Sequence, residues 1–183
     1  MLITPAGGEL QITHLPLLLE RESGSQGTLL GHVARANPHA RHLDRLSTTA
    51  IYSGPHAFIS PGWYEAEHVV PTWNYVAVHV TGTTQIVSDR DELWELVRSL
   101  TDHYESGMPN PWTLPESTAI DRMLDQIVGF RLQIERIEGK WKLNQNHSRE
   151  RRLKVIARLR EQGDANSLAM ARLMEVSLED SAD

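Results

Sequence analysis

The segment VVPTWNYVAVHVTG, residues Val69–Gly82, decides how the rest of the chain is arranged. Valines stand at every second position from Val76 to Val80, and this period of two is typical of a β-strand. The strand opens with a threonine, a tryptophan, an asparagine and a tyrosine, Thr72 to Tyr75. These side chains could pack at the rim of a barrel, or they could meet a flat ligand with polar edges.

Turn residues divide the rest of the first half into short strand-like runs. Glycine at position 82 predicts a bulge or bend in the long strand. Asn37 followed by Pro38 predicts a capped helical turn. The other expected strands in this half include Leu2–Thr4, Leu10–Leu19 and Thr28–Ala34.

The second half begins helical. Asp89 or Asp91 is expected to cap a helix whose apolar residues share one face, namely Leu93, Leu96, Val97, Leu100 and Tyr104. A short helix from Thr118, a strand from Phe130 and two helices after Ser148 follow, with Gly163 as the C-cap between the last two. Strands, then helices, then a strand predict an α+β barrel or sandwich.

Composition narrows the class of protein. The chain has 183 residues, 40% of them hydrophobic and 23% charged, and no cysteine, which excludes disulfides, thiolate nucleophiles and iron–sulfur clusters. Its net charge of -6 argues against wholesale coating by nucleic acid. We find no signal peptide and no apolar run of the ~20 residues that span a bilayer, so we expect a cytoplasmic protein with no membrane association.

The junction GHVARANPHARHL is a candidate phosphate site. A strand ends at Arg35, Asn37 caps the turn, and Arg41 and His42 follow. Backbone N–H groups at a helix start and a nearby guanidinium suit a phosphate. The alternative is an ordinary strand–helix junction with solvated arginines.

Three further stretches combine aromatic and hydrogen-bonding groups. GPHAFISPGWY offers Ser60 and Trp63, either as part of a ligand wall or as a corner plug. PTWNY offers donors, acceptors and stacking area, or a rim cluster. GKWKLNQN suits a flat anionic cofactor, or is a solvated connection. The candidates from the last two stretches are Thr72, Trp73, Asn74, Trp141, Lys142, Gln145 and Asn146.

The segment from Ser148 is basic and helical, which would allow direct contact with DNA. We favour a solvated basic helix packed through Leu153, Ile156, Ala157 and Leu159. Histidines at positions 32, 56 and 79 lie on three candidate strands, but this spacing has no motif value for a metal or haem site. The chain contains no nucleophile elbow, P-loop or dinucleotide fingerprint, so hydrolase, NTPase and Rossmann dehydrogenase lose support.

Four stretches in this order, GHVARANP, GPHAFISPGWY, VPTWNYVAVHVTG and GKWKLNQN, resemble the PaiB-type FMN-binding negative transcriptional regulators. The resemblance runs from about Gly8 to Met174. It implies a split β-barrel of the pyridoxamine-phosphate-oxidase-like kind, with peripheral helices and a helical C-terminal extension. It also implies a homodimer that holds FMN near the subunit interface. On this basis we expect an FMN-binding domain at residues 1–147 and a helical extension at 148–183.

The resemblance also suggests roles for the candidates. Arg35, Asn37, Arg41 and His42 occupy the stretch that commonly holds the flavin phosphate. Trp73 and Asn74 match the start of a strand that often approaches the flavin, and a late loop that often closes over it corresponds to Trp141, Lys142, Gln145 and Asn146. Family members usually begin further upstream, so Met1–Thr4 is expected to be the end of their first strand. The implied function is negative transcriptional regulation. A flavin-dependent oxidoreductase that uses a nicotinamide nucleotide is the main alternative, and a haem- or metal-binding barrel is the third.

Overall fold

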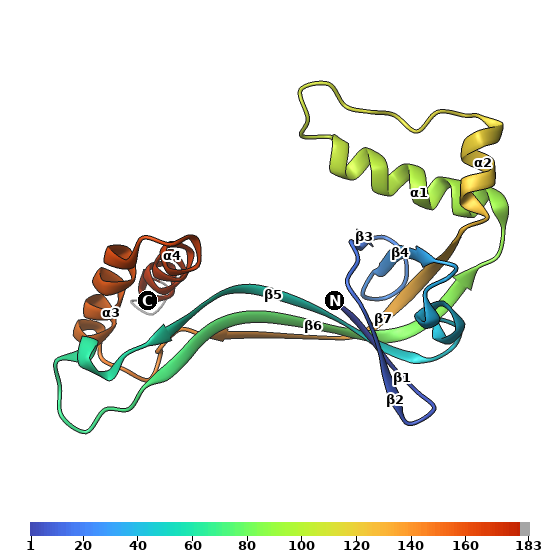
Figure 1. The fold of residues 1–183 in the computed structure, drawn as a ribbon. Helices are drawn as coiled ribbons and strands as arrows, with labels where there is room; N and C mark the ends of the chain where they lie inside the picture. The colour runs from blue at the N-terminus through green and yellow to red at the C-terminus, as the bar shows by residue number, and fades with distance from the viewer. Residues whose placement is uncertain (180–183) are drawn as a thin grey trace. The chain divides into compact units, whose positions relative to one another are not determined.

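The computed structural model describes residues 1–179. Its strands form a seven-stranded sheet in the order β2-β1-β5-β6-β7-β4-β3, and Figure 1 shows how the elements follow one another along the chain. The strands are β1 (Leu2–Ala6), β2 (Glu9–Thr13), β3 (Leu18–Glu20), β4 (Thr28–Ala34), β5 (Ser47–Ile59), β6 (Thr72–Val87) and β7 (Ile127–Lys142). The helices are α1 (Arg90–Glu105), α2 (Thr118–Leu124), α3 (Arg149–Gln162) and α4 (Ala165–Glu179), with 3-10 helices η1 (Pro38–His42) and η2 (Pro61–Tyr64).

The chain forms two compact units. Unit 1 comprises Met1–Ile51 and His79–Ile137. Unit 2 comprises Tyr52–Val78 and the chain from Glu138 onward. Strands β5, β6 and β7 contribute residues to both units. The boundary expected from the sequence, between residues 147 and 148, stays a prediction.

Unit 1 is built on antiparallel strand pairs. Strand β1 pairs with β2 along its length and with β5 at Leu2 and Ile3, so it lies inside the sheet. That Met1–Thr4 is the end of the family's first strand stays a prediction. Strand β4 pairs with β3 and with β7. Helix α1 packs on β3 and β4 through a buried cluster of Leu30, Val87, Leu93, Leu96, Leu100 and Leu124.

Gly82 is required by a close approach of two strands. A Cβ built on Gly82 would lie 1.9 Å from the carbonyl oxygen of Gln133 on β7. No side chain fits there unless the backbone moves, because that distance is far inside van der Waals contact. At Gly82, where a bend was expected, strand β6 therefore approaches the backbone of the neighbouring strand β7 too closely for a side chain.

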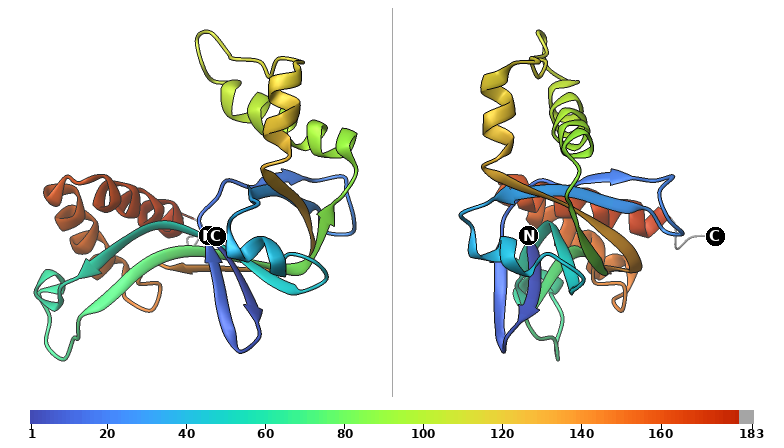
Figure 2. Two further views of the ribbon diagram at one scale, coloured as in Figure 1. Left: turned by 45° about the vertical axis from the view of Figure 1, so that its right-hand side comes forward. Right: turned by 90° about the vertical axis from the view of Figure 1, so that its right-hand side faces the viewer.

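Unit 2 is a helical pair packed on strand ends. Helices α3 and α4 lie side by side in both views of Figure 2. They bury a cluster that includes Tyr64 of η2, Ile59 of β5 and Leu159 of α3. Ser148 caps the start of α3, and Gly163 ends that helix with φ of 73°, as the sequence predicts.

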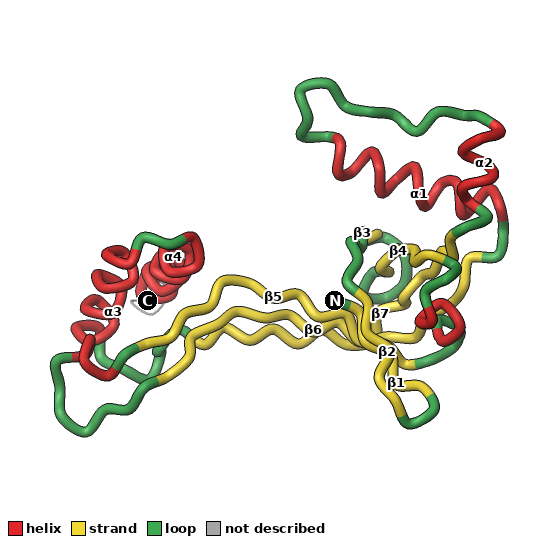
Figure 3. Tube along the Cα trace, in the orientation of Figure 1, coloured by secondary structure: helices red, strands yellow, loops and turns green. Residues whose placement is uncertain are grey.

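Several local expectations differ from the structure. The run Leu10–Leu19 is not one strand but two, β2 and β3, because Pro16 cannot donate to a sheet ladder. The face of α1 is confirmed for its three leucines, whereas Tyr104 is exposed. The loop between α1 and α2, residues 106–117, is long and lacks secondary structure of its own (Figure 3).

Candidate functional site

A cavity of about 560 Å³ opens in unit 1 where η1, the end of β6, the start of α1 and the start of β7 meet. Two of the phosphate candidates, Arg35 and Arg41, line it together with Arg90 and the side of Asp89. The rest of its wall is mainly apolar, with Ile86, Val87, Leu93, Leu124, Ile127 and Val128. Cations set in an apolar wall suit a ligand that carries an anion and a hydrophobic body.

The guanidinium of Arg35 makes hydrogen bonds within the protein and also lines the cavity. Its Nε donates to the carbonyl of Asp125 at 2.7 Å, and one Nη donates to the carbonyl of Ile127 at 2.8 Å. The first bond satisfies the carbonyl of the C-cap of α2, and the second ties Arg35 to the first residue of β7. The remaining amino group, Nη1, is the part of Arg35 that can meet a ligand.

Arg41 and Arg90 differ in how far their charge is neutralised. Arg90 lies 2.6 Å from the carboxylate of Asp125 and also contacts Asp121. Arg41, on η1, has no hydrogen bond or ion pair among residues 1–179, and its side chain is exposed. Arg41 is therefore the strongest phosphate candidate in the described chain.

The other two phosphate candidates act within the protein. The Asn37 side chain accepts from the backbone N–H of His39 at 3.0 Å, as the N-cap of η1, and its Nδ2 donates to the hydroxyl of Thr13 at 3.2 Å. His42 is half-buried and does not line the cavity. The capping role expected for Asn37 is confirmed, and direct contact of Asn37 or His42 with a phosphate stays a prediction.

The ring candidates lie in unit 2. The rings of His56 and Trp73 stack with centroids 5.4 Å apart, and with Tyr75 they line a shallow hollow of about 340 Å³. Trp73 is 47% exposed, so its indole face is available to a planar ligand. Thr72, one residue earlier, is half-buried.

The side chain of Asn74 is buried, unlike that of the neighbouring Trp73. The Nδ2 group of Asn74 points to the sulfur of Met174 on α4 at 3.5 Å. Its Oδ1 has no partner among residues 1–179. A ligand cannot reach this amide in the described arrangement, so a binding role for Asn74 gains no support from its position.

The end of β7, at Trp141 and Lys142, and the loop that follows it to His147 are held together by local hydrogen bonds. Gln145 accepts from the N–H of Leu143 and donates to the carbonyl of Trp141. Asn144, which has φ of 60°, donates to the buried hydroxyl of Tyr64 at 2.8 Å, and burial raises the pKa of that phenol. Gln145 thus braces the loop, whereas Trp141, Lys142 and Asn146 are exposed.

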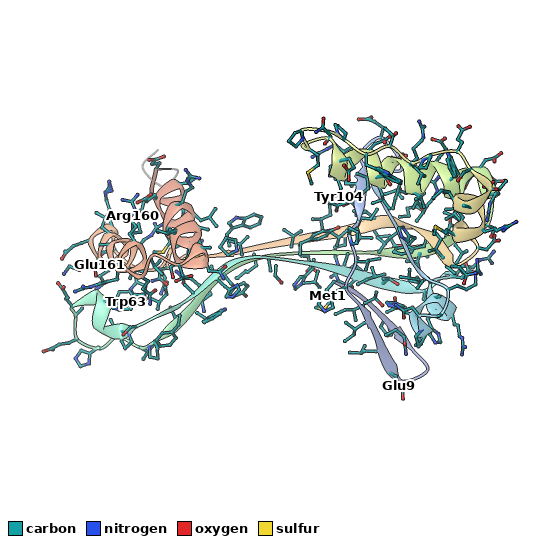
Figure 4. The ribbon with its side chains drawn as sticks, turned by 45° about the horizontal axis from the view of Figure 1, so that its top comes forward. Met1, Glu9, Trp63, Tyr104, Arg160 and Glu161 are labelled. Atoms are coloured by element: carbon teal, nitrogen blue, oxygen red, sulfur yellow. The ribbon has the colours of Figure 1, made fainter. Side chains whose placement is uncertain are left out.

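Ser60 and Trp63 lie at a different corner of unit 2. Trp63, on η2, lines a surface hollow with Gly62, Arg158, Glu161 and Gln162, and Figure 4 shows it beside Glu161 of α3. Ser60 precedes η2 and makes no side-chain capping bond. The corner-plug interpretation fits Trp63 better than a place beside Trp73.

The basic helix α3 is less free than its sequence suggests. Arg152 is buried and donates to Met174 O and to the hydroxyl of Ser177, and burial lowers its pKa. Lys154 pairs with Glu65 and Glu150. The expected packing face is confirmed for Ile156 and Leu159 and wrong for Leu153 and Ala157, which are exposed. Arg152 and Val155 are buried instead.

The three strand histidines do not form a metal site. No group of three or more His, Cys, Asp or Glu side chains placed to hold a metal ion occurs within residues 1–179. His56 belongs to unit 2, whereas His32 and His79 belong to unit 1.

Within residues 1–179 no helix is long and apolar enough to cross a bilayer.

Comparison with known proteins decides the family. A family model described as a putative FMN-binding domain matches residues 1–136. The chain is 35% identical over 179 residues to the protease synthase and sporulation protein PAI 2 of Bacillus subtilis (strain 168), covering 96% of this chain and 85% of that protein. The chain belongs to the PaiB-type FMN-binding family. The resemblance inferred from the four sequence stretches is thereby confirmed.

Solved structures of this fold agree with the family. The FAD- and heme-binding protein from Mycobacterium smegmatis aligns with a TM-score of 0.56 at 15% identity, covering 83% of this chain and 69% of that one. The flavocytochrome Anf3 from Azotobacter vinelandii aligns with a TM-score of 0.53 at 16% identity, covering 76% of this chain. The chain spans 59% of the length of Anf3. The α+β split-barrel fold predicted for the chain is confirmed.

The structure therefore brings some candidates together and separates others. Arg35 and Arg41 share one cavity, whereas Trp73 and Trp63 line two different hollows in unit 2. Sequence reasoning missed the contribution of Ser88, Asp89 and Arg90 to the cavity. The available signal was that the long strand ends directly at the cap of α1.

Proposed function

We propose that this chain binds FMN and acts as a PaiB-like negative transcriptional regulator. The observation that carries the proposal is the match of residues 1–136 to the putative FMN-binding domain, together with the identity to PAI 2 over nearly the whole chain. We further propose a cytoplasmic homodimer. Static light scattering tests the dimer, and a monomer at micromolar concentration contradicts it.

The cavity of unit 1 takes the FMN phosphate in this proposal. Arg41 supplies an unneutralised guanidinium, and Nη1 of Arg35 supplies a second donor. Guanidinium groups bind phosphate oxygens through charge-assisted hydrogen bonds. The lining carries three arginines and one aspartate, and Arg90 is already paired with Asp125, so Arg41 and Arg35 supply the cationic donors that remain for a ligand. This donor set fits a doubly charged phosphate monoester.

The candidates of unit 2 are proposed, by themselves, as a surface for a planar ring. Trp73 and Trp141 expose indole surface, and Thr72, Lys142 and Asn146 supply hydrogen-bonding groups near them in sequence. Such groups orient a planar heterocycle and exclude water from one of its faces. Bound FMN would supply electron-accepting chemistry, and no side chain in the cavity of unit 1 has an assigned catalytic role.

A fluorescence titration tests this proposal. FMN fluorescence should be quenched by the wild-type protein, and Arg41→Ala should weaken FMN about tenfold or more, as expected for a lost hydrogen bond to a charged group. Riboflavin, which lacks the phosphate, should bind wild type and Arg41→Ala equally. Arg21→Ala is the control, because Arg21 is an exposed arginine outside the cavity. Failure of the wild-type protein to quench FMN at any concentration contradicts the proposal.

The same sample separates regulation from catalysis. If bound flavin is bleached by NADH or NADPH, the chain is a flavin-dependent oxidoreductase rather than only a regulator. A Soret band on adding haem would support the haem-binding alternative. Retention of the oxidised flavin spectrum under both treatments supports the regulator.

Direct contact with DNA is proposed through the start of α3. Arg149 and Arg151 have no ion pair among residues 1–179, whereas Arg158 is paired with Glu161. Neutralising Arg149 and Arg151 to glutamine should weaken binding to duplex DNA and reduce its salt dependence. Arg158→Gln is the matched control. Equal mobility shifts for all three proteins would mean that α3 does not contact DNA.

A further inference from the structure

A buried chain of polar side chains links η1 to the first hairpin of unit 1. The imidazole of His39 is 1% exposed and lies between two threonines. Its Nδ1 is 2.9 Å from the hydroxyl of Thr13 on β2, and its Nε2 is 2.8 Å from the hydroxyl of Thr4 on β1. Thr4 in turn lies 2.7 Å from the hydroxyl of Thr48, and Thr48 donates to the carbonyl of Leu46 at 3.3 Å.

The two ends of this chain fix the direction of every hydrogen bond in it. The carbonyl of Leu46 can only accept, and it accepts from the hydroxyl of Thr48 at 3.3 Å and from that of Thr84 at 3.1 Å. The single proton of Thr48 is used in this bond. Thr48 therefore accepts from Thr4, and Thr4, whose proton is now used, accepts from Nε2 of His39.

The hydrogen bonds at the Asn37 end of the chain also set the protonation of His39. The Nδ2 group of Asn37 can only donate, and it donates to the hydroxyl of Thr13. Thr13 is then free to donate its own proton to Nδ1 of His39. Every donor meets an acceptor only when His39 is neutral and carries its proton on Nε2.

The surroundings favour the neutral ring. Burial lowers the pKa of His39, and the nearby charge of His42 lowers it further. On the elements packed against η1, β1 brings no titratable side chain, β2 brings Glu9 and β4 brings His32. On η1 itself the charged or titratable neighbours are Arg41 and His42. Within residues 1–179 no carboxylate bonds to His39 to stabilise an imidazolium.

We propose that His39, as the neutral Nε2–H tautomer, is a positioning residue that ties η1 to β1 and β2 and so holds Arg41 at the cavity of unit 1. The ring bonds both strands of the hairpin, while its backbone N–H bonds Asn37 at the start of η1. Arg41 follows two residues later on the same short helix. The link to ligand binding rests on the proposed function, in which this cavity takes the FMN phosphate.

Two readouts test the inference, and the first needs neither a variant nor a ligand. Long-range ¹H–¹⁵N spectra of the wild-type protein should show His39 as the neutral Nε2–H tautomer at pH 7. A dominant Nδ1–H tautomer or an imidazolium at that pH overturns the inference, whatever flavin does.

The second readout compares flavins in threonine variants. Thr4→Val removes the acceptor of Nε2–H, and Thr13→Val removes the donor to Nδ1. Each should weaken FMN about tenfold, the loss expected when one ~1.4 kcal/mol interaction is gone, while leaving riboflavin unchanged. Thr49→Val is the matched control, because Thr49 bonds Thr81 at 3.0 Å in unit 1 and takes no part in the chain to His39.

The outcomes separate this inference from the proposed function. If wild type binds FMN and both variants bind it equally well, His39 does not position the site, and the proposed function stands. If wild type binds no FMN but shows the Nε2–H tautomer, the proposed function fails. Hydrogen exchange of the His39 and Ala40 amides, which both bond to Asn37, then decides: it should quicken in Thr4→Val and not in Thr49→Val, and equal rates overturn the inference.

Discussion

His32 shows how a single buried group can set the pH dependence of stability. Its Nδ1 is buried with no hydrogen-bond partner among residues 1–179, and burial lowers its pKa from 6.5. An unpaired buried imidazole nitrogen costs free energy that a hydrocarbon of similar size would not. His32 pairs in register with Gly129 of β7, on the strand that lies next to β4.

We therefore expect His32→Leu to be neutral or stabilising at pH 8 and increasingly stabilising in acid. Below pH 6.5 the unfolded wild-type chain takes up a proton at His32 that the folded chain refuses until its lower pKa is reached. Wild-type stability therefore falls across that interval by up to about 1.4 kcal/mol per pH unit, and the variant lacks this loss. Urea unfolding at pH 8, 6.5 and 5.5 checks it, and a difference that does not grow toward acid contradicts it.

Gly82 gives the sharpest prediction for a single residue. Gly82→Ala should lower the free energy of unfolding by about 3 kcal/mol, the upper end of overpacking costs, because the added carbon meets the backbone of Gln133. Gly107→Ala is the control, since a Cβ there meets nothing within 4 Å, and it should change stability by less than about 0.5 kcal/mol. Equal stability of the two variants would mean that β6 and β7 do not approach as described.

The loop after β7 shows how an element can be fixed by one unusual residue. Asn144 adopts a left-handed backbone conformation and donates to the buried hydroxyl of Tyr64. The ring of Tyr64 also stacks on the ring of His147, with centroids 4.5 Å apart. Asparagine tolerates this conformation better than most residues with a Cβ. The loop that follows Trp141 and Lys142 therefore depends on Asn144 for its shape.

Two substitutions at position 144 separate its two roles. Asn144→Gly loses only the bond to Tyr64, whereas Asn144→Ala also places an unfavourable side chain at positive φ. Both should be less stable than wild type, and the alanine variant should be the worse by about 1 kcal/mol. Chemical denaturation measures the difference. An alanine variant as stable as the glycine variant would exclude backbone strain at this position.

At the scale of the single element, helix caps could be predicted from neighbouring residues, whereas contacts between residues far apart in the chain could not. The cap of α1 at Asp89 and the C-cap at Gly163 depend on neighbouring residues, and both were predicted correctly. Arg35 bonds carbonyls about 90 positions away, and no local pattern in the sequence encodes that use of its guanidinium. Arg152 was expected in solvent because arginine is rarely buried, but it lies between α3 and α4.

For the whole molecule, the order of four sequence stretches identified the family and the fold before any geometry was known, because a family resemblance sums over many positions. The same stretches predicted less about the site. Candidates for the phosphate lie in unit 1 and candidates for the ring lie in unit 2, and side-chain burial separates Asn74 from the exposed Trp73 beside it. Burial on a strand alternates by one residue, and a motif alone does not say which face is covered.

A crystal structure of the protein with FMN tests the central claim most directly. The account predicts phosphate oxygens about 2.7–3.2 Å from the guanidinium of Arg41, within the cavity beside η1. Phosphate held elsewhere, with Arg41 in solvent, would contradict it.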